Sequence, residues 1–457
     1  MKGPETMLSE RLRRLEPGPG YFRIFLRFPF LAGVVLRLFV FLFQDPFNND
    51  YHFQVIDWIH KNGTIPIATQ LSQAYHPPLY YVLAQLFYGG DSSMPGLKVL
   101  QLFSLLTSLL TFVVFTLMIN RFIESERVRR SATLLAACLP QLIMFGNFVS
   151  NDSLANLIGA LLFLQAYLYV EKPNPARKVG LAVILGLGLL TKGTFLAFIP
   201  VVLGLVIVVE WRSRKRWTAV VLSALLVAAL GLGIGAYKYV ESYRHFGDPF
   251  IHNADPLVQK ATKWNWAAAQ KHTFTGLGSV FDWNIPKLML HPTLGDETRH
   301  SYFLMMYGTF WYQYLYESNL MGNKTGFRYL GSLIYLLALV PTLVMFLGAY
   351  DAGAKLRAVI RRRELETRTI QELFGVLAFL AAFGLVVYLG IRIDIWSCFQ
   401  SRLFFPAFWG VIVLFSSGLA RIERRPRIAP TVHRLLNVLF VCFALYFLTE
   451  LAIILFS

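Results

Sequence analysis

The chain is built mostly of apolar runs, separated by short connections that carry its charged residues. A bilayer core needs roughly 20 apolar residues per helix, and the sequence predicts about 11 such segments. They fall at residues 22–43, 97–119, 132–149, 153–170, 179–190, 195–209, 219–239, 329–349, 373–391, 403–419 and 435–456. We therefore expect an all-α polytopic membrane protein, in which the pair at 179–190 and 195–209 forms a tight helical hairpin.

Basic residues gather in alternate connections, including RFIESERVRR, KPNPARK, WRSRKRW and KLRAVIRRRELETR. Lys and Arg concentrate on the cytoplasmic side of membrane proteins, so these connections and the N-terminus are predicted to be cytoplasmic. The net charge of +17 is thereby spread between apolar runs. A nucleic-acid-binding protein would instead gather it on one solvated face, so we expect no nucleic-acid partner.

The same alternation predicts the organisation of the chain. We expect a cytoplasmic tail, an N-terminal transmembrane module with a long outer loop, an outer loop region, and C-terminal transmembrane helices. Within the first outer loop, apolar spacing predicts two short helices lying in the membrane interface. The four parts are residues 1–21, 22–238 (with the loop at 44–96), 239–328 and 329–457, and the two interfacial helices are expected at 51–60 and 79–87.

Asp50 is the first candidate for chemistry, in the stretch NNDYHFQVIDWIHKNG. It follows the first apolar segment closely, so we expect it near the outer membrane surface. A carboxylate there can accept a proton from an attacking hydroxyl as a general base. The same position also suits the N-cap of the helix that follows. Asp45 and Asp57 are its nearest rivals, and Asp57 is expected on the solvated face of that helix.

Two further candidates belong to the outer connections. His76 precedes two prolines in YHPPLYY, which force an extended approach to the next helix. That rigidity can aim the imidazole at an anion, although a histidine is also accommodated at an interface without such a role. Asp152, in FVSNDSLAN, either caps the following helix or points into the same cavity as Asp50. Ionisable residues at the membrane edge warrant a functional hypothesis.

Several cationic residues could recognise phosphate. Lys192 stands at the outer tip of the hairpin, where it meets either an anionic partner or lipid phosphate by snorkelling. Arg402 opens an outer span, Arg392 closes the preceding one, and Arg37 lies within the first apolar segment. Guanidinium groups match phosphate oxygens and lysine adds a point charge, so this set is typical of phosphate binding.

The order of these motifs resembles the GT-C glycosyltransferases. Within that superfamily it is similar to the branch of protein O-mannosyltransferases and lipid A aminoarabinose transferases, from about residue 22 to residue 420. The motifs are an acid–x–His element (Asp50, His52), HPPLYY from His76, SND with Asp152, LTKG with Lys192, and QSRLFFP with Arg402.

The resemblance implies transfer of a sugar from a polyprenyl-phosphate carrier to an unknown acceptor on the periplasmic, extracellular or lumenal side. Asp50 would be the catalytic base, with inversion at the sugar, and Asp152 would match the later outer acid. The carrier phosphate would meet the basic residues of the outer face. Those residues are His52, His76, Lys192, Arg392 and Arg402. Where many members carry Asp-Glu, this chain has Asn49-Asp50, so either residue could occupy the family's base position.

Two other functional classes stay open from the sequence. A transporter or lipid-linked-sugar flippase without catalysis would not depend on a single outer acid. A structural or assembly subunit could use the wide outer loop for docking. No cofactor is assigned, and a divalent metal stays open, because the loop histidines lack the tight spacing of a metal site.

Overall fold

The computed structural model describes residues 22–44, 46, 51–214, 216–263, 282–290, 301–312, 328–362, 365–393 and 398–456. Within these ranges the chain forms helices and no strand. Eight of the described helical segments are long and apolar enough to cross a membrane. They contain α5 (Met94–Phe122), α8 (Asn151–Glu171), α10 (Phe198–Arg214), α11 (Trp217–Gly235), α18 (Arg328–Arg362), α19 (Thr367–Ile393), α20 (Phe408–Glu423) and α21 (Ala429–Phe456). The predicted all-α polytopic membrane fold is confirmed.

The other three predicted segments are also helical, but they are shorter than a spanning helix. The first contains α2 (Phe28–Phe43), preceded by the 3-10 helix η1 (Phe22–Leu26). The third is divided into α6 (Glu126–Cys138) and α7 (Pro140–Asn147). The first arm of the predicted hairpin is α9 (Pro175–Leu189), which packs between α8 and α11.

Arg37 explains how the break between α6 and α7 is tolerated. Pro140 has no backbone N–H, so the carbonyl of Ala136 loses its helical donor. The Arg37 guanidinium donates to the carbonyl oxygens of Ala136 at 3.1 Å and Ala137 at 3.3 Å, and its Nε donates to Ser108 Oγ at 3.2 Å. Arg37 is 1% exposed and lies over the Phe112 ring. Its partners are therefore backbone carbonyls inside the bundle, which differs from the phosphate role suggested by its sequence position.

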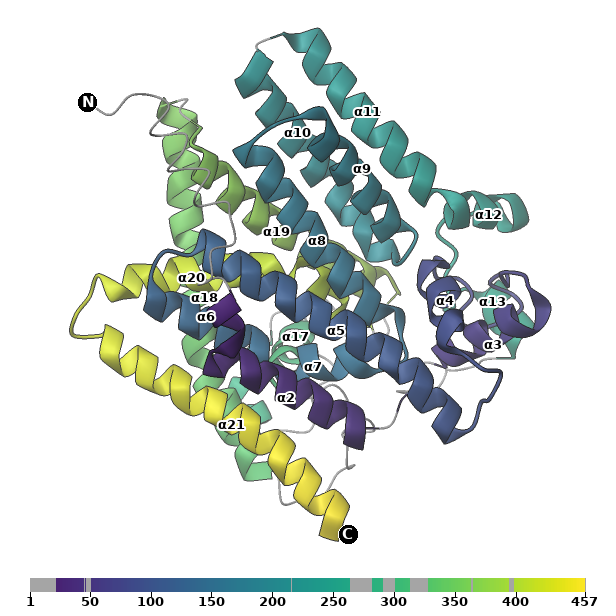
Figure 1. Cartoon of the computed structure of the whole chain (residues 1–457), viewed down its shortest axis with the longest axis horizontal. Coiled ribbons are helices and arrows are strands. Elements are labelled where there is room, and N and C mark those ends of the chain that lie inside the picture. The colour runs from purple at the N-terminus through teal and green to yellow at the C-terminus, as the bar shows by residue number, and fades with distance from the viewer. Residues whose placement is uncertain are drawn as a thin grey trace.

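Short helices gather at one end of the bundle, at the right of Figure 1. The first outer loop forms two short helices at the predicted positions, α3 (His52–Asn62) and α4 (Leu79–Ala84), and their place at the membrane interface stays a prediction. The segment between them packs against the second loop, which forms α12 (Tyr237–Phe246) and α13 (Pro256–Thr262), and Ala68, Ile251 and Val258 form a small buried cluster there. The second loop also contributes α16 (Ile285–Leu290), which packs against α17 and α18, and the buried helix α17 (Tyr302–Trp311).

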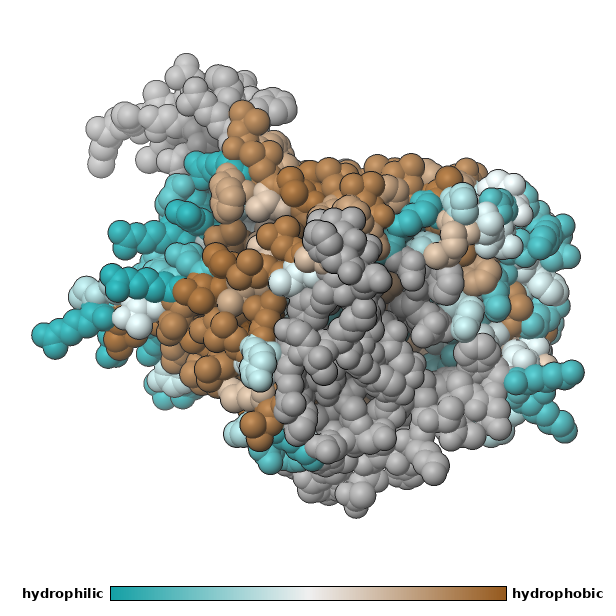
Figure 2. All heavy atoms as spheres, turned by 90° about the horizontal axis from the view of Figure 1, so that it is seen from below, coloured by the Kyte–Doolittle hydropathy of each residue, from teal (hydrophilic) through white to brown (hydrophobic). Residues whose placement is uncertain are grey.

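The surface is divided in the way that a bilayer requires. Figure 2 shows a broad hydrophobic face between hydrophilic regions at its left and right edges. Exposed apolar side chains such as Leu222, Leu225 and Leu343 lie on candidate spanning helices. Their exposure is the expected state of residues that contact lipid tails rather than water.

Candidate functional site

Asp152 lies in the first turn of α8, at the end of the bundle that holds α3 and α4. The N-cap of α8 is Ser150, whose hydroxyl accepts a hydrogen bond from the Asp152 backbone N–H at 3.4 Å. Asp152 is therefore not the helix cap, and that alternative is wrong. Its carboxylate, 1% exposed, is available for other partners.

Two cations bind this carboxylate from distant parts of the chain. Lys192 Nζ donates to Asp152 Oδ1, and Arg402 Nη1 donates to Asp152 Oδ2 at 3.1 Å. All three side chains are buried. We call this group the acidic–basic trio. The trio brings together three of the residues that the sequence selected.

A tight turn places Lys192. After α9 ends at Leu189, the Lys192 backbone N–H still donates to the Gly188 carbonyl at 2.9 Å, and the 3-10 helix η3 (Gly193–Ala197) follows at once. A Cβ atom at Gly188 would lie 2.1 Å from the ring of Phe195. Because real Cβ atoms do not approach so closely, a glycine is needed for the chain to fold back and present Lys192 to Asp152.

Arg402 is placed by the 3-10 helix η6 (Ser401–Ala407), which lies between α8, α17 and α19. Ser401 binds Thr309 of α17 twice, through its N–H at 3.0 Å and its hydroxyl at 2.6 Å. On the other side, a Cβ at Gly159 of α8 would stand 2.1 Å from the Pro406 carbonyl oxygen. The guanidinium also lies over the Phe145 ring, 4.7 Å from its centroid.

Gln400 is a site residue that the sequence did not reveal. Its side-chain oxygen accepts from Arg402 Nε at 2.6 Å, and because arginine can only donate, this contact fixes which end of the amide faces it. The Gln400 amide nitrogen is buried and has no hydrogen-bond partner among the described residues. Only its position two residues before Arg402 could have drawn attention to it.

Five aromatic rings form a row beside the trio. Successive ring centroids are 5.8, 5.4, 3.9 and 4.4 Å apart, and the His52 ring nitrogen Nδ1 lies 2.8 Å from the Tyr81 hydroxyl. The order along the row is Tyr81, His52, His76, Tyr75 and His252. His52 and His76 were predicted. Tyr75, Tyr81 and His252 were not, and His252 comes from the second outer loop, with no motif around it.

His76 connects this row with the cationic side of the trio. Its partial burial, followed by the positive charges that His52, Lys192, His252 and Arg402 can carry, holds the pKa of the imidazole well below 6.5. Burial also lowers the pKa of His252, to about 4. Both rings are thus neutral at pH 7, and each can donate one hydrogen bond from one ring nitrogen and accept one at the other.

Hydrogen bonds between backbone groups, and one from the Asn151 side chain, join the outer motifs to one another. Leu79 N–H, in HPPLYY, donates to the Leu190 carbonyl at 2.9 Å, next to the Lys192 turn. Val149 N–H, just before SND, donates to the Pro46 carbonyl at 2.7 Å. The Asn151 amide donates to the Thr191 carbonyl at 3.4 Å. The motifs predicted for the outer face therefore share one end of the bundle.

Some predicted residues fall elsewhere. Asp45, Asn49 and Asp50 lie outside the described residues. The N-cap of α3 is Tyr51, in the left-handed region at φ 53°. Asp57 pairs with Lys61 at 2.7 Å and accepts from Tyr88 at 2.8 Å.

Arg392 is exposed near the end of α19, and its contact in the described structure is with the Tyr388 hydroxyl at 3.5 Å. That contact does not join it to the trio.

The charge balance of the trio limits its chemistry. The three side chains of the trio together carry one formal positive charge, and the Gln400 amide nitrogen near them has no hydrogen-bond partner among the described residues. Such a site is suited to a singly charged anion, and hydrogen bonds to charged groups are the strong ones. Within the described ranges, no three His, Cys, Asp or Glu side chains are grouped as a metal site would require.

Comparison with known proteins places this site in a family context. Residues 75–232 match the family model of dolichyl-phosphate-mannose-protein mannosyltransferases. The segment includes His76, Asp152 and Lys192. The predicted resemblance to GT-C membrane glycosyltransferases is thereby confirmed. No curated protein shows significant sequence similarity to the chain.

Three solved structures are similar at low sequence identity. The oligosaccharyltransferase AglB from Archaeoglobus fulgidus, in complex with an inhibitory peptide and a dolichol-phosphate, is 16% identical, with 95% of this chain and 55% of AglB covered and a TM-score of 0.46. ArnT from Cupriavidus metallidurans, bound to undecaprenyl phosphate, is 15% identical, with 90% and 80% covered and a TM-score of 0.38. The arabinosyltransferase EmbB from Mycobacterium smegmatis is 12% identical, with 85% and 40% covered and a TM-score of 0.39. The chain spans about half the length of AglB.

Proposed function

We propose that this chain, whose residues 75–232 match the mannosyltransferase family, is a polyprenyl-phosphate-sugar-dependent glycosyltransferase. It transfers the sugar to an acceptor on the non-cytoplasmic face of the membrane. The observation that supports this best is the trio, because a buried pair of cations shares a single carboxylate there. Together, Asp152, Lys192 and Arg402 carry one formal positive charge, opposite in sign to the single negative charge of a lipid-linked sugar phosphodiester.

The trio then acts on the leaving group. When the bond between the anomeric carbon and the phosphate oxygen breaks, its electron pair stays on the phosphate, and negative charge grows there. Lys192 and Arg402, with the free amide of Gln400, are held in place before the reaction starts. Fixed donors aimed at developing charge are among the largest contributions to catalysis. Asp152 is the positioning residue that holds the two cations together.

Asp50 is the proposed general base. It takes the proton of the acceptor hydroxyl, whose oxygen attacks the anomeric carbon from the face opposite the phosphate and inverts it. Asp50 is bonded directly to Tyr51, the residue before His52, and His52 belongs to the aromatic row beside the trio. On the other side of this segment, the Pro46 carbonyl accepts a hydrogen bond from the backbone N–H of Val149, which lies three residues before Asp152. A neutral amide cannot replace the carboxylate, so Asp50 rather than Asn49 is proposed as the base.

The imidazole rings of His52 and His76 are proposed to contact the donor next to the phosphate. Arg392 remains a proposed contact for the carrier at the edge of the site. The flat faces of the aromatic row suit the packing of a sugar ring.

A release assay tests this function. Membranes containing the protein are supplied with a panel of lipid-linked sugars, and release of free polyprenyl phosphate is measured. Asp50→Asn should slow release by roughly 10²–10⁴-fold, the span expected for loss of a general base, while carrier binding is kept. Asp57→Asn is the matched control in the same loop, and it should keep wild-type turnover because Asp57 pairs with Lys61 and Tyr88. Equal turnover of Asp50→Asn and wild type rules out the assignment, and carriers that cross the membrane intact would indicate a flippase.

A further inference from the structure

A second cavity lies at the opposite end of the bundle from the trio. Its volume is about 440 Å³, and α20 runs along it from Trp409 to Arg424. Asp152 begins α8, whereas the cavity meets α8 near its other end, at Tyr167. The positive-inside rule predicts this end to be cytoplasmic. The cavity is therefore at the depth of the other leaflet, and the proposed transfer reaction does not use it.

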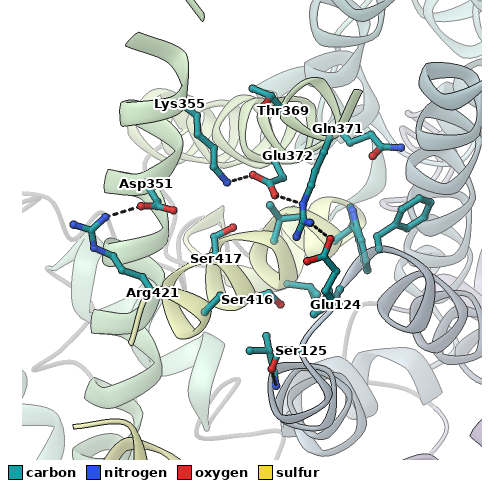
Figure 3. A pocket seen from close by; sticks show the side chains of 18 of the residues that line it. Glu124, Ser125, Asp351, Lys355, Thr369, Gln371, Glu372, Ser416, Ser417 and Arg421 are labelled. Atoms are coloured by element: carbon teal, nitrogen blue, oxygen red, sulfur yellow. Dashed lines mark hydrogen bonds and ion pairs between the residues drawn. The ribbon is translucent and has the colours of Figure 1, made fainter. Parts of the chain in front are cut away.

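Ion pairs from several segments hold the rim of the cavity (Figure 3). Glu372 of α19 binds Lys355 of α18 and also accepts from Arg368 Nε at 3.2 Å. Arg368 in turn binds Glu124, in the connection after α5. On the facing side, Arg421 of α20 donates to Asp351 at 2.6 Å. The rim is thus built by four parts of the chain, and most of its charges neutralise one another.

After this pairing, the mouth offers one cation and one carboxylate. Arg424 and Glu366 both line the cavity and are exposed, and neither makes an ion pair with any residue that the structure describes. The lining as a whole contains four basic and four acidic side chains, so it carries no net formal charge. Such a mouth suits a headgroup that carries both signs better than it suits an anion.

The cavity becomes less polar with depth along α20. Below Arg424 come Ser417 and Ser416, and the Ser416 hydroxyl is buried and has no partner in the described part of the chain. Val413 and Trp409 lie deeper, and with a rise of 1.5 Å per residue Trp409 is about 22 Å from Arg424 along the helix. Phe122 and Tyr167 add further rings to this part. The lining thus changes from charged groups to hydroxyl groups to hydrocarbon, which follows the decrease in polarity of a phospholipid from its headgroup to its acyl chains.

We propose that this cavity is a binding site for a phospholipid whose headgroup carries a phosphate and a primary amine. The phosphate lies at Arg424, the amine at the carboxylate of Glu366, and an ester oxygen accepts from Ser416. One acyl chain runs along Val413 toward Trp409. The site is separate from the proposed sugar transfer, and it would tie the ends of α18, α19 and α20 to the lipid of that leaflet.

The full-length protein tests this site. It is reconstituted in vesicles containing equal amounts of phosphatidylethanolamine, phosphatidylcholine and phosphatidylglycerol, extracted in mild detergent, and its retained lipid is measured by native mass spectrometry. Phosphatidylethanolamine should be enriched over both others, because phosphatidylcholine has no N–H donors and phosphatidylglycerol has no amine. Enrichment of phosphatidylglycerol above the others, or no selective retention, overturns the proposal.

Two variants localise the binding. Arg424→Ala should lower the retained phosphatidylethanolamine by about fivefold, the effect expected for one arginine at a membrane surface. Arg425→Ala is the matched control, because Arg425 is exposed at the next position and does not line the cavity. Equal retention in Arg424→Ala and Arg425→Ala contradicts the site. Both residues are exposed, and thermal unfolding of each variant checks that the fold is kept.

Discussion

Two buried lysines stand near opposite ends of α9, and they differ in the charges that surround them. Lys178 donates to Glu210 at 2.9 Å and to Ser223 at 2.8 Å, and Glu210 also accepts from Tyr169 at 2.8 Å. One cation there meets one carboxylate. Lys192 shares Asp152 with Arg402, so two cations meet one carboxylate. The named side chains sum to no net formal charge at Lys178 and to one formal positive charge at the trio.

We propose that the Lys178–Glu210 pair holds helices together, whereas the trio binds a ligand. Burying an ion is costly unless a partner of opposite sign is present. At Lys178 the partner belongs to the protein, and the group joins α8, α9, α10 and α11. At the trio, two cations share one carboxylate of the described chain, and we propose that the carrier phosphate binds beside them.

The largest expected effect is on stability. Lys178→Met leaves the Glu210 carboxylate buried without its cation, which should lower the free energy of unfolding by roughly 3–5 kcal/mol. Turnover per folded molecule should stay at the wild-type level. Chemical unfolding in detergent, with activity measured on the folded fraction, checks both. Restoring neutrality with Lys178→Met and Glu210→Leu together should recover most of the loss, and a double variant no more stable than the single one contradicts the pairing.

A comparable effect, on turnover, is expected at the trio. Arg402→Met removes one donor to the leaving phosphate and should reduce kcat by about 10²–10³-fold, as for loss of a donor from an oxyanion site. Arg425→Met, at the far end of α20, is the control arginine and should keep its activity. If both variants lose activity to the same degree, Arg402 has no special part in the reaction.

A smaller effect is expected at Gln400. Gln400→Leu removes the acceptor that orients Arg402 Nε and the free amide beside it, so kcat should fall by roughly tenfold, the worth of one hydrogen bond to a charged group. Gln400→Glu keeps the acceptor but adds a negative charge to the trio. This variant should retain the orientation of Arg402 and still weaken the binding of the lipid-linked sugar. Steady-state kinetics at varied concentrations of that sugar donor would show the weaker binding as a higher KM. A Gln400→Glu enzyme with wild-type KM argues against the charge account.

The smallest effect is on pH dependence. Since the pKa of His76 is held well below 6.5 in the folded protein, the unfolded chain binds more protons once the pH falls below about 6.5. Stability should therefore fall with pH below that value, by at most about 1.4 kcal/mol per pH unit from this residue. His76→Gln should flatten the profile, with a remaining slope from His252, whose pKa is lowered to about 4. A His76→Gln profile that coincides with wild type places the effect elsewhere.

Much of the fold could be predicted because bilayer thickness and charge asymmetry act on whole segments. Apolar runs and basic connections identified every long helix, and the α3 and α4 positions followed from apolar spacing within the first loop. The break at Pro140 was not predicted. A proline often bends a spanning helix without ending it, and the compensating Arg37 is about 100 residues away in the sequence.

The site was predicted only in part, for a similar reason. Asp152, Lys192 and Arg402 were selected because each is a charge at an outer turn, where a charge needs an explanation. Gln400 and His252 carry no such signal. Gln400 is important only through its contact with Arg402, and His252 reaches the site through the packing of the second outer loop against Tyr75. Contacts of this kind depend on tertiary structure and leave no local pattern.

The most direct test of the proposed phosphate site is the affinity of the protein for a short-chain polyprenyl phosphate that carries no sugar. Its dissociation constant should rise by about ten- to a hundredfold in Lys192→Met, the range for a lost hydrogen bond between charged groups. It should stay unchanged in Lys178→Met, measured on folded protein. Equal affinities in wild type and Lys192→Met, or equal losses in the two lysine variants, would contradict a phosphate site built on Asp152, Lys192 and Arg402.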